Sequence, residues 1–105
     1  MSTDSLTALR DATRAFAAAR DWEPYHTPKN LAMAMSVEAA EVVEHFQWLK
    51  TGVPSELDAA TREGVGQELA DVLLYLVQLA DKLDVDLYQA AVEKMKLNAL
   101  KYPAP

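Results

Sequence analysis

Hydrophobic side chains recur along residues 5–20 at a period close to 3.6, which predicts a first helix. Thr3 and Asp4 precede this segment, and either side chain is suited to cap the helix. Residues 22–27 show no such period and contain a proline, so the helix is expected to end before them. The apolar positions that set the period are Leu6, Leu9, Ala12, Phe16 and Ala19.

A second helix is predicted from Pro28 to about Lys50. Thr27 is a favoured N-cap residue, and proline is favoured at the first helical position because its missing N–H is not needed there. Gly52 lies just past the expected end, where glycine commonly stops a helix. The polar residues 53–61 that follow predict a loop.

A third helix is predicted from about Arg62 to Leu83. Its start is weak, because Gly64 and Gly66 each cost about 1 kcal/mol relative to alanine in a helix. Residues 69–80 are apolar on nearly every side, which is typical of a helix that is buried all round. In so short a chain, such a helix indicates that a second subunit covers part of it.

A fourth helix is predicted to begin at Asp86, which forms a candidate capping box with Gln89, and to end around Tyr102 before Pro103. Glycine is scarce, with 3 residues, and the prolines leave long uninterrupted stretches, which favours helices over strands. The expected fold is therefore all-α. We expect a single domain of residues 1–105, built as a four-helix bundle that oligomerisation completes.

Composition narrows the classes of function. The formal net charge of −6 argues against binding a nucleic acid polymer, because such binding requires clustered lysine and arginine. The chain has no run of 18 apolar residues and no basic start followed by an apolar block, so no membrane association is expected and a cytoplasmic location is predicted. Without cysteine, a metal ion would have to be held by oxygen or imidazole ligands.

Acidic side chains repeat at a spacing of three on both central helices. Glu38, Glu41 and Glu44 fall in the second predicted helix, and Glu68 and Asp71 fall in the third. Residues three apart project from the same side of a helix, so two facing pairs can bring four carboxylates to one cation. Oxygen ligands suit Mg²⁺, and Mn²⁺ is an alternative. The predicted metal ligands are Glu38, Glu41, Glu68 and Asp71.

Asp71 is the acid that is hardest to explain without a metal ion. It lies within the apolar residues 69–80, and the nearest basic residues in that helix are Arg62 and Lys82, nine positions before and eleven after it. A carboxylate buried there is destabilising unless a cation or hydrogen bonds compensate. The alternative is that these acids form an ordinary solvated helix face.

A di-iron carboxylate bundle is a competing interpretation, and it needs Glu-x-x-His on two helices. Only Glu23 and His26 have that spacing, and Pro24 lies between them in a segment not expected to be helical. His45 follows Glu41 by four residues and is either a further ligand or a packing and hydrogen-bonding residue.

Around these acids the chain resembles the MazG-like, all-α nucleoside triphosphate pyrophosphohydrolases. Their metal signature, Glu-x-x-Glu on one helix and Glu-x-x-Asp on the next, is matched by Glu38-Ala39-Ala40-Glu41 and Glu68-Leu69-Ala70-Asp71. Longer strings extend the resemblance over nearly the whole chain and are typical of the dCTP pyrophosphatase branch. These strings are Arg20-Asp21-Trp22-Glu23, His26-x-Pro28-Lys29-Asn30-Leu31, Glu44-x-Phe46-Gln47-Trp48, Asp71-Val72-Leu73-x-Tyr75-Leu76-Val77, Lys94-Met95-x-x-Asn98 and Tyr102-Pro103.

The resemblance implies a homo-oligomer, either a dimer or a tetramer, whose site draws on more than one subunit. It implies Mg²⁺ on the four acids and a nucleoside triphosphate substrate, with dCTP or a modified pyrimidine deoxynucleotide expected first. The residues implied to contact the nucleobase are Trp22, His26, Trp48 and Tyr75. Those implied to bind the phosphates are Lys94, Asn98 and Lys101, which also share one face of the predicted fourth helix. Thr13 stands where relatives carry histidine, a difference that concerns base preference rather than the reaction.

The implied reaction is hydrolysis of the nucleotide to its monophosphate and pyrophosphate, which removes surplus or modified nucleotides. A carboxylate that the metal does not saturate must accept the proton of the attacking water, and Glu41 is the first candidate, with Glu44 second. A second class of function stays open, in which the chain is a non-catalytic oligomeric interaction module. In that case the acids are inert. Trp48 and Tyr75 have a separate alternative, in which both are core aromatics.

Overall fold

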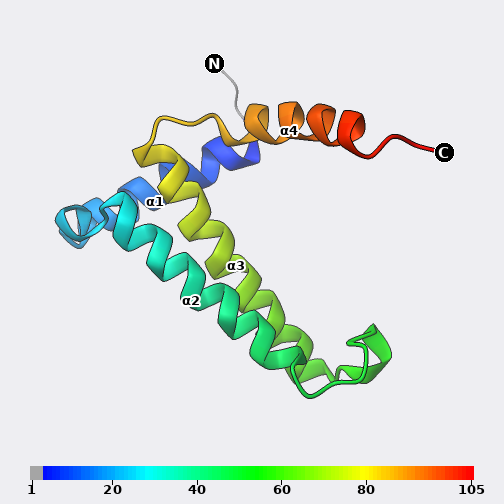
Figure 1. Ribbon diagram of the computed structural model, residues 1–105. Coiled ribbons are helices and arrows are strands. Elements are labelled where there is room, and N and C mark those ends of the chain that lie inside the picture. The colour runs from blue at the N-terminus through cyan, green and yellow to red at the C-terminus, as the bar shows by residue number, and fades with distance from the viewer. Residues whose placement is uncertain (1–3) are drawn as a thin grey trace.

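The computed structural model describes residues 4–105, which form four α-helices and two short 3₁₀ helices and contain no strand (Figure 1). The prediction of an all-α fold is confirmed. In chain order the elements are α1 (Ser5–Ala19), η1 (Glu23–Tyr25), α2 (Pro28–Phe46), η2 (Pro54–Glu56), α3 (Ala59–Lys82) and α4 (Leu87–Lys101).

Each α-helix begins at a side chain that accepts a hydrogen bond from a backbone N–H of its first turn. The predicted caps Asp4, Thr27 and Asp86 are confirmed, whereas Thr3 lies outside the described residues. The side chain of Gln89 donates to Glu93, so only the Asp86 half of the predicted capping box is present. The bonds are Thr7 N to Asp4 at 2.8 Å, Asn30 N to Thr27 at 3.3 Å, Thr61 N to Asp58 at 2.7 Å and Gln89 N to Asp86 at 2.9 Å.

The connection between α2 and α3 differs from the prediction at both ends. α2 ends at Phe46 rather than near Lys50, and the chain then folds back so closely at Gly52 that a Cβ there would lie 2.8 Å from Cδ1 of Phe46. Gly52 has a φ of +78°, a conformation that glycine adopts without strain. α3 begins at Ala59, inside the predicted loop, because Asp58 caps it there.

Glu56 closes this connection. Its carboxylate accepts hydrogen bonds from the backbone N–H of Lys50, at 3.1 Å, and from both the N–H and the hydroxyl of Thr51, at 3.1 and 2.7 Å. The hydrogen bond from the Thr51 side chain is the largest cause that lowers the pKa of Glu56. The loop is therefore fixed by a charged acceptor that the spacing of hydrophobic residues does not reveal.

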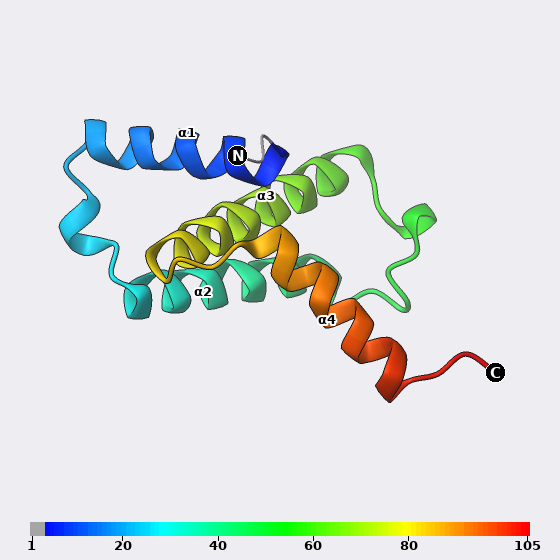
Figure 2. The same ribbon diagram turned by 90° about the horizontal axis from the view of Figure 1, so that it is seen from above.

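α3 is the central helix. It packs along α2 and, toward its other end, against α1, while α4 leaves the end of α3 and makes few contacts with the other helices (Figures 1 and 2). The buried hydrophobic residues lie on α1, α2 and α3, and α4 has none within the described chain. Within residues 4–105 the predicted four-helix bundle is therefore not complete, because α1, α2 and α3 pack together and α4 stands apart.

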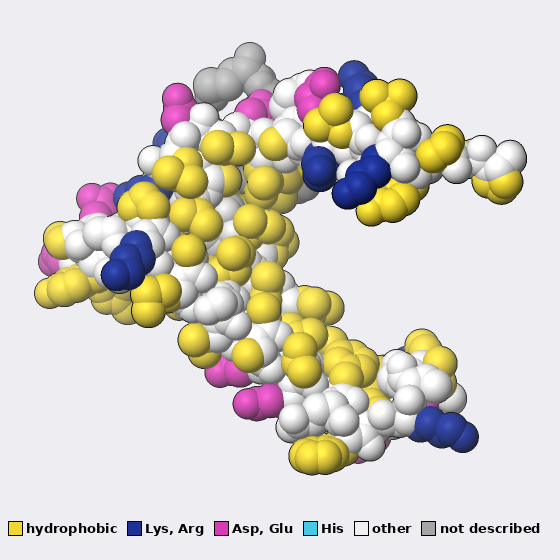
Figure 3. Space-filling view, in the orientation of Figure 1, with side chains coloured by type: hydrophobic (Ala, Val, Ile, Leu, Met, Phe, Trp, Pro, Cys, Tyr) yellow, Lys and Arg dark blue, Asp and Glu magenta, His cyan; other side chains and the backbone are white. Residues whose placement is uncertain are grey.

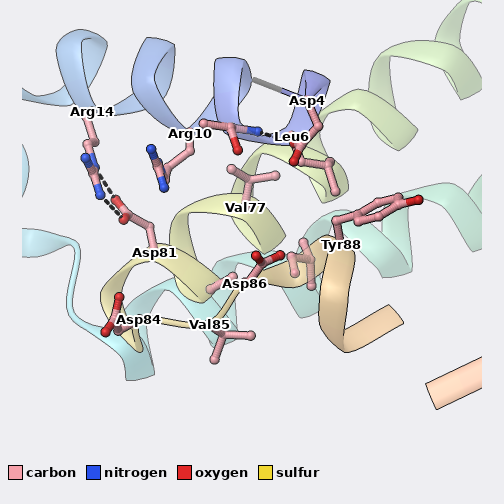
Figure 4. Close-up of a pocket in the computed structure, with 13 residues that line it drawn as sticks. Asp4, Leu6, Arg10, Arg14, Val77, Asp81, Asp84, Val85, Asp86 and Tyr88 are labelled. Atoms are coloured by element: carbon pink, nitrogen blue, oxygen red, sulfur yellow. Dashed lines mark hydrogen bonds and ion pairs between the residues drawn. The ribbon is translucent and has the colours of Figure 1, made fainter. Parts of the chain in front are cut away.

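An ion pair fixes α1 against the end of α3 (Figure 4). Arg14 Nε donates to Asp81 Oδ2 at 2.8 Å, and a second guanidinium nitrogen binds the other carboxylate oxygen. The hydrogen bond from Arg14 is the largest cause that lowers the pKa of Asp81. The pair borders a cavity of about 200 Å³ at the junction of α1, α3 and the start of α4. The junction thus sets the point from which α4 departs.

Within residues 4–105 the apolar middle of α3 is not covered on all sides, and the prediction that a second subunit covers part of residues 69–80 stays a prediction. Val77 and Ala80 are buried, but Leu69 and Leu73 are exposed because only α1 and α2 pack against α3. Among the described residues, no helix is both long enough and apolar enough to cross a membrane. The single-domain organisation and the cytoplasmic location stay predictions.

Candidate metal centre

Three of the four predicted metal ligands meet where α2 and α3 lie side by side. Glu38 and Glu41 are one turn apart on α2, and Glu68 faces them from α3. One carboxylate oxygen from each residue lies within 4.8 Å of the others, and all three side chains are half-buried. Such a cluster of carboxylate oxygens is the donor set that a hard divalent cation prefers.

Glu38 is the acid whose surroundings most disfavour its negative charge. Its Oε2 is buried and has no hydrogen-bond partner among residues 4–105. A hydrogen bond shared with Glu41, then desolvation and the charges of Glu41, Asp71 and Glu68, raise the pKa of Glu38 to about 7. A buried oxygen without a hydrogen-bond partner and a carboxyl group with a raised pKa are both features that a bound cation would relieve. The residues present therefore fit a bound cation.

Asp71 and Glu44 lie at the edge of this centre rather than in it. Asp71 follows Glu68 by one turn, but the group of oxygens within 4.8 Å contains only Glu38, Glu41 and Glu68 among the described residues. Asp71 is also exposed, so the expectation that it is buried is wrong for a single chain, because the apolar α3 residues beside it lack a cover. Its charge still contributes to the raised pKa of Glu38. Glu44 is exposed on α2.

A cavity of about 390 Å³ opens between α1, the segment after it and α3. It contains three of the four residues expected to contact a nucleobase, Trp22, His26 and Tyr75, together with Asp71. The rings of Trp22 and His26 are 6.0 Å apart in an edge-on arrangement. Aromatic walls with a few polar groups are typical of small-molecule sites. Asp71 connects this cavity to the acidic cluster.

The fourth predicted base contact, Trp48, does not share this cavity within one chain. Trp22 and His26 precede α2 and Trp48 follows it, and a helix of 19 residues is about 28 Å long. The Trp48 side chain is 89% exposed. The residues predicted to bind phosphate are likewise exposed on α4, away from the three packed helices. These residues are Lys94, Asn98 and Lys101.

Sequence reasoning missed part of the cavity wall. Phe16 and Gln78 line it, and Phe16 also lies edge-on to Trp22, with ring centroids 5.6 Å apart. Leu9, Thr13 and Phe16 line the cavity from α1 at spacings of four and three residues, which is helical spacing. The period of α1 was therefore a usable signal, although it could not distinguish a cavity wall from a core.

Comparison with known proteins agrees with this fold. Residues 33–105 match the family described as MazG-like, and the chain belongs to this family. Among its relatives, dCTP pyrophosphatase 1 from Homo sapiens is 43% identical over 102 residues, covering 95% of this chain and 60% of that protein. The protein of the same name from Mus musculus is 42% identical over 101 residues, covering 94% of this chain and 59% of that protein.

The chain thus spans about 60% of the length of the curated relatives that it matches. One solved structure, in contrast, aligns with this chain over nearly the full length of both. A pyrophosphatase from Archaeoglobus fulgidus DSM 4304 superposes with a TM-score of 0.88 at 38% sequence identity, covering 99% of this chain and 97% of that chain.

Proposed function

We propose that the protein is a nucleoside triphosphate pyrophosphohydrolase, acting on dCTP or a modified pyrimidine deoxynucleotide to release the monophosphate and pyrophosphate. The observation that carries the proposal is the cluster of three carboxylates beside an aromatic cavity. The relatives named dCTP pyrophosphatase 1 favour dCTP as the first substrate to test. Removal of surplus or modified nucleotides is the corresponding role.

In this proposal Glu38, Glu41 and Glu68, with Asp71 beside them, hold Mg²⁺, for which Mn²⁺ can substitute. When bound, the ion neutralises triphosphate charge and polarises the phosphoryl group. Trp22, His26 and Tyr75 orient the nucleobase by stacking and edge contacts, which costs little reorganisation because the cavity is already formed.

In this proposal a carboxylate of the chain accepts the proton of the attacking water. Glu41 is the first candidate to accept the proton of the attacking water, because it belongs to the half-buried cluster. Glu44 remains the second candidate, one turn further along α2 and exposed.

We propose further that a second copy of the chain covers the exposed apolar surface, giving a dimer or a tetramer. Met95, Leu97 and Leu100 are exposed on α4, the last at 81%. Hydrophobic side chains also gather on the hollow side of the molecule between α3 and α4 (Figure 3). Proteins that are monomeric rarely leave such surfaces open. A partner on this surface would carry the residues that one chain keeps apart: Trp48, Lys94, Asn98 and Lys101.

Metal-dependent cleavage of dCTP is the direct test of the proposed function. With Mg²⁺, chromatography of the products is expected to show dCMP and pyrophosphate, and chelation with EDTA is expected to stop the reaction. Undiminished turnover in EDTA, or release of phosphate with dCDP, would contradict the proposal. A non-catalytic interaction module would show neither turnover nor a rise in melting temperature with Mg²⁺ and a non-hydrolysable dCTP analogue, whereas binding stabilises the proposed enzyme.

Light scattering after size-exclusion chromatography tests the proposed assembly. At micromolar concentration the protein is expected to elute as a dimer or a tetramer, and Leu100→Lys should shift it toward the monomer because a charge enters an apolar interface. Ser55→Lys, in the exposed turn of η2, is the matched control and should leave the mass unchanged. A wild-type monomer would refute the assembly.

A further inference from the structure

His45 contacts one of the three clustered acids from the neighbouring helix. It lies near the end of α2, and its Nε2 is 3.2 Å from Oε2 of Glu68 on α3. The side chains are 29% and 21% exposed, so the contact is largely shielded from water. A hydrogen bond to a carboxylate in such surroundings is stronger than one on an open surface.

Gly64 provides the room for this ring. It lies on α3 one turn before Glu68, and a Cβ built on it would be 3.0 Å from Cε1 of His45. The imidazole therefore rests directly on the backbone of α3. Gly66, two residues further along the same helix, meets nothing within 4 Å. Both glycines destabilise the helix by a similar amount relative to alanine, but only Gly64 makes room for His45.

The geometry argues against His45 as a ligand in the cluster. Among the described residues, the group of potential ligand atoms within 4.8 Å of one another contains three glutamates and not this histidine. A carboxylate offers about four lone-pair sites, so Glu68 can accept a hydrogen bond from His45 and still donate electron density to a cation. His45 thus contacts Glu68, a predicted metal ligand, without belonging to the cluster itself.

We infer that His45 is a positioning residue that fixes the carboxylate of Glu68 toward Glu38 and Glu41, and that Gly64 exists to admit its ring. This inference rests on the proposed function, since it assumes that the three glutamates bind a cation. Hydrogen-bond partners of metal ligands reduce the freedom of the ligand, and losing them typically lowers metal affinity or activity about 10- to 100-fold.

Direct binding of Mn²⁺ to the metal-free protein, followed by electron paramagnetic resonance, tests the inference without relying on turnover. His45→Leu is expected to weaken Mn²⁺ binding about 10- to 100-fold. His45→Gln, whose terminal amide can donate from nearly the same position as Nε2, should recover much of that loss. Circular dichroism and the melting temperature of the metal-free variants establish that they are folded.

The two glycines provide a matched pair that leaves His45 itself intact. Gly64→Ala should displace the ring and weaken Mn²⁺ binding, whereas Gly66→Ala should keep wild-type affinity while raising the melting temperature through its better helix propensity. Equal affinities in Gly64→Ala and Gly66→Ala, or an unchanged affinity in His45→Leu, would overturn the role of His45. Failure of the wild-type protein to bind Mn²⁺ would instead refute the proposed metal site.

Discussion

Replacing Glu38 with glutamine is expected to abolish metal-dependent turnover and, at the same time, to make the metal-free protein more stable. Glu38 has a buried oxygen without a partner, and three neighbouring acids raise its pKa. An amide of the same shape removes the repulsion but is a poor ligand for a hard cation. Turnover should fall at least about 100-fold, because even the outer partners of metal ligands cost 10- to 100-fold when removed.

The stability difference should depend on pH with a defined sign. The pKa of Glu38 is about 7 in the folded protein and near its ordinary value of 4.5 in the unfolded chain. The folded state therefore binds this proton more tightly, and the stability it contributes is present at low pH and lost as pH rises through the folded pKa. Metal-free wild type should accordingly lose melting temperature relative to Glu38→Gln between about pH 5 and pH 8.

Thermal melts with and without Mg²⁺ across this pH range measure both effects. Glu63→Gln, which removes an exposed acid from α3, is the control and should behave like the wild type. Added Mg²⁺ should reverse the trend in the wild type, because the ion binds the ionised form and displaces the proton. A Glu38→Gln variant that still turns over dCTP, or whose melting curve follows the wild type at every pH, would show that the cluster is an ordinary acidic surface.

Sequence spacing predicted that acids of α2 and α3 meet, but not which of them has a raised pKa and an unpartnered oxygen. The repeat of three put Glu38 and Glu41 on one face of α2, and Glu68 meets them from α3, whereas Asp71, predicted with them, lies outside the group of three. The apolar surroundings of Asp71 in the sequence suggested burial, yet neighbours in sequence are not neighbours in packing, and this side chain is exposed in one chain. The orphaned oxygen belongs to Glu38 instead.

The starts of α1, α2 and α4 could be predicted from the sequence, whereas the end of α2 could not, because it depends on tertiary contacts. Asp4, Thr27 and Asp86 were predictable caps because a side chain and a backbone N–H three residues later are sufficient to form them. The early end of α2 depends on Gly52 packing against Phe46 and on Glu56 closing the loop, contacts between residues that no periodicity links. α4 makes few contacts with the other helices, and its helical period alone does not indicate this.

Trp48→Ala is expected to raise KM for dCTP with little change in kcat, even though Trp48 lies far from the cavity in its own chain. The proposed assembly would bring this exposed ring to the cavity of a neighbouring subunit. Stacking of an aromatic side chain on a base is worth about 1 to 3 kcal/mol, which corresponds to roughly 5- to 150-fold in affinity. Loss of binding that is equal in the ground state and the transition state appears in KM rather than in kcat.

Mixing two impaired variants, Glu38→Gln and Trp48→Ala, tests whether Trp48 acts across the interface. In a shared site, Glu38 and Trp48 come from different subunits, so co-refolding equal amounts of Glu38→Gln and Trp48→Ala would give sites that contain both intact residues. Random pairing makes about a quarter of all sites intact, and activity at dCTP concentrations below the wild-type KM should recover to about that fraction. If both residues served one site from the same chain, no mixture would contain an intact site and the activity would equal the mean of the two separate variants. An unchanged KM in Trp48→Ala would instead assign this side chain to the subunit contact, leaving Trp22, His26 and Tyr75 as the base contacts.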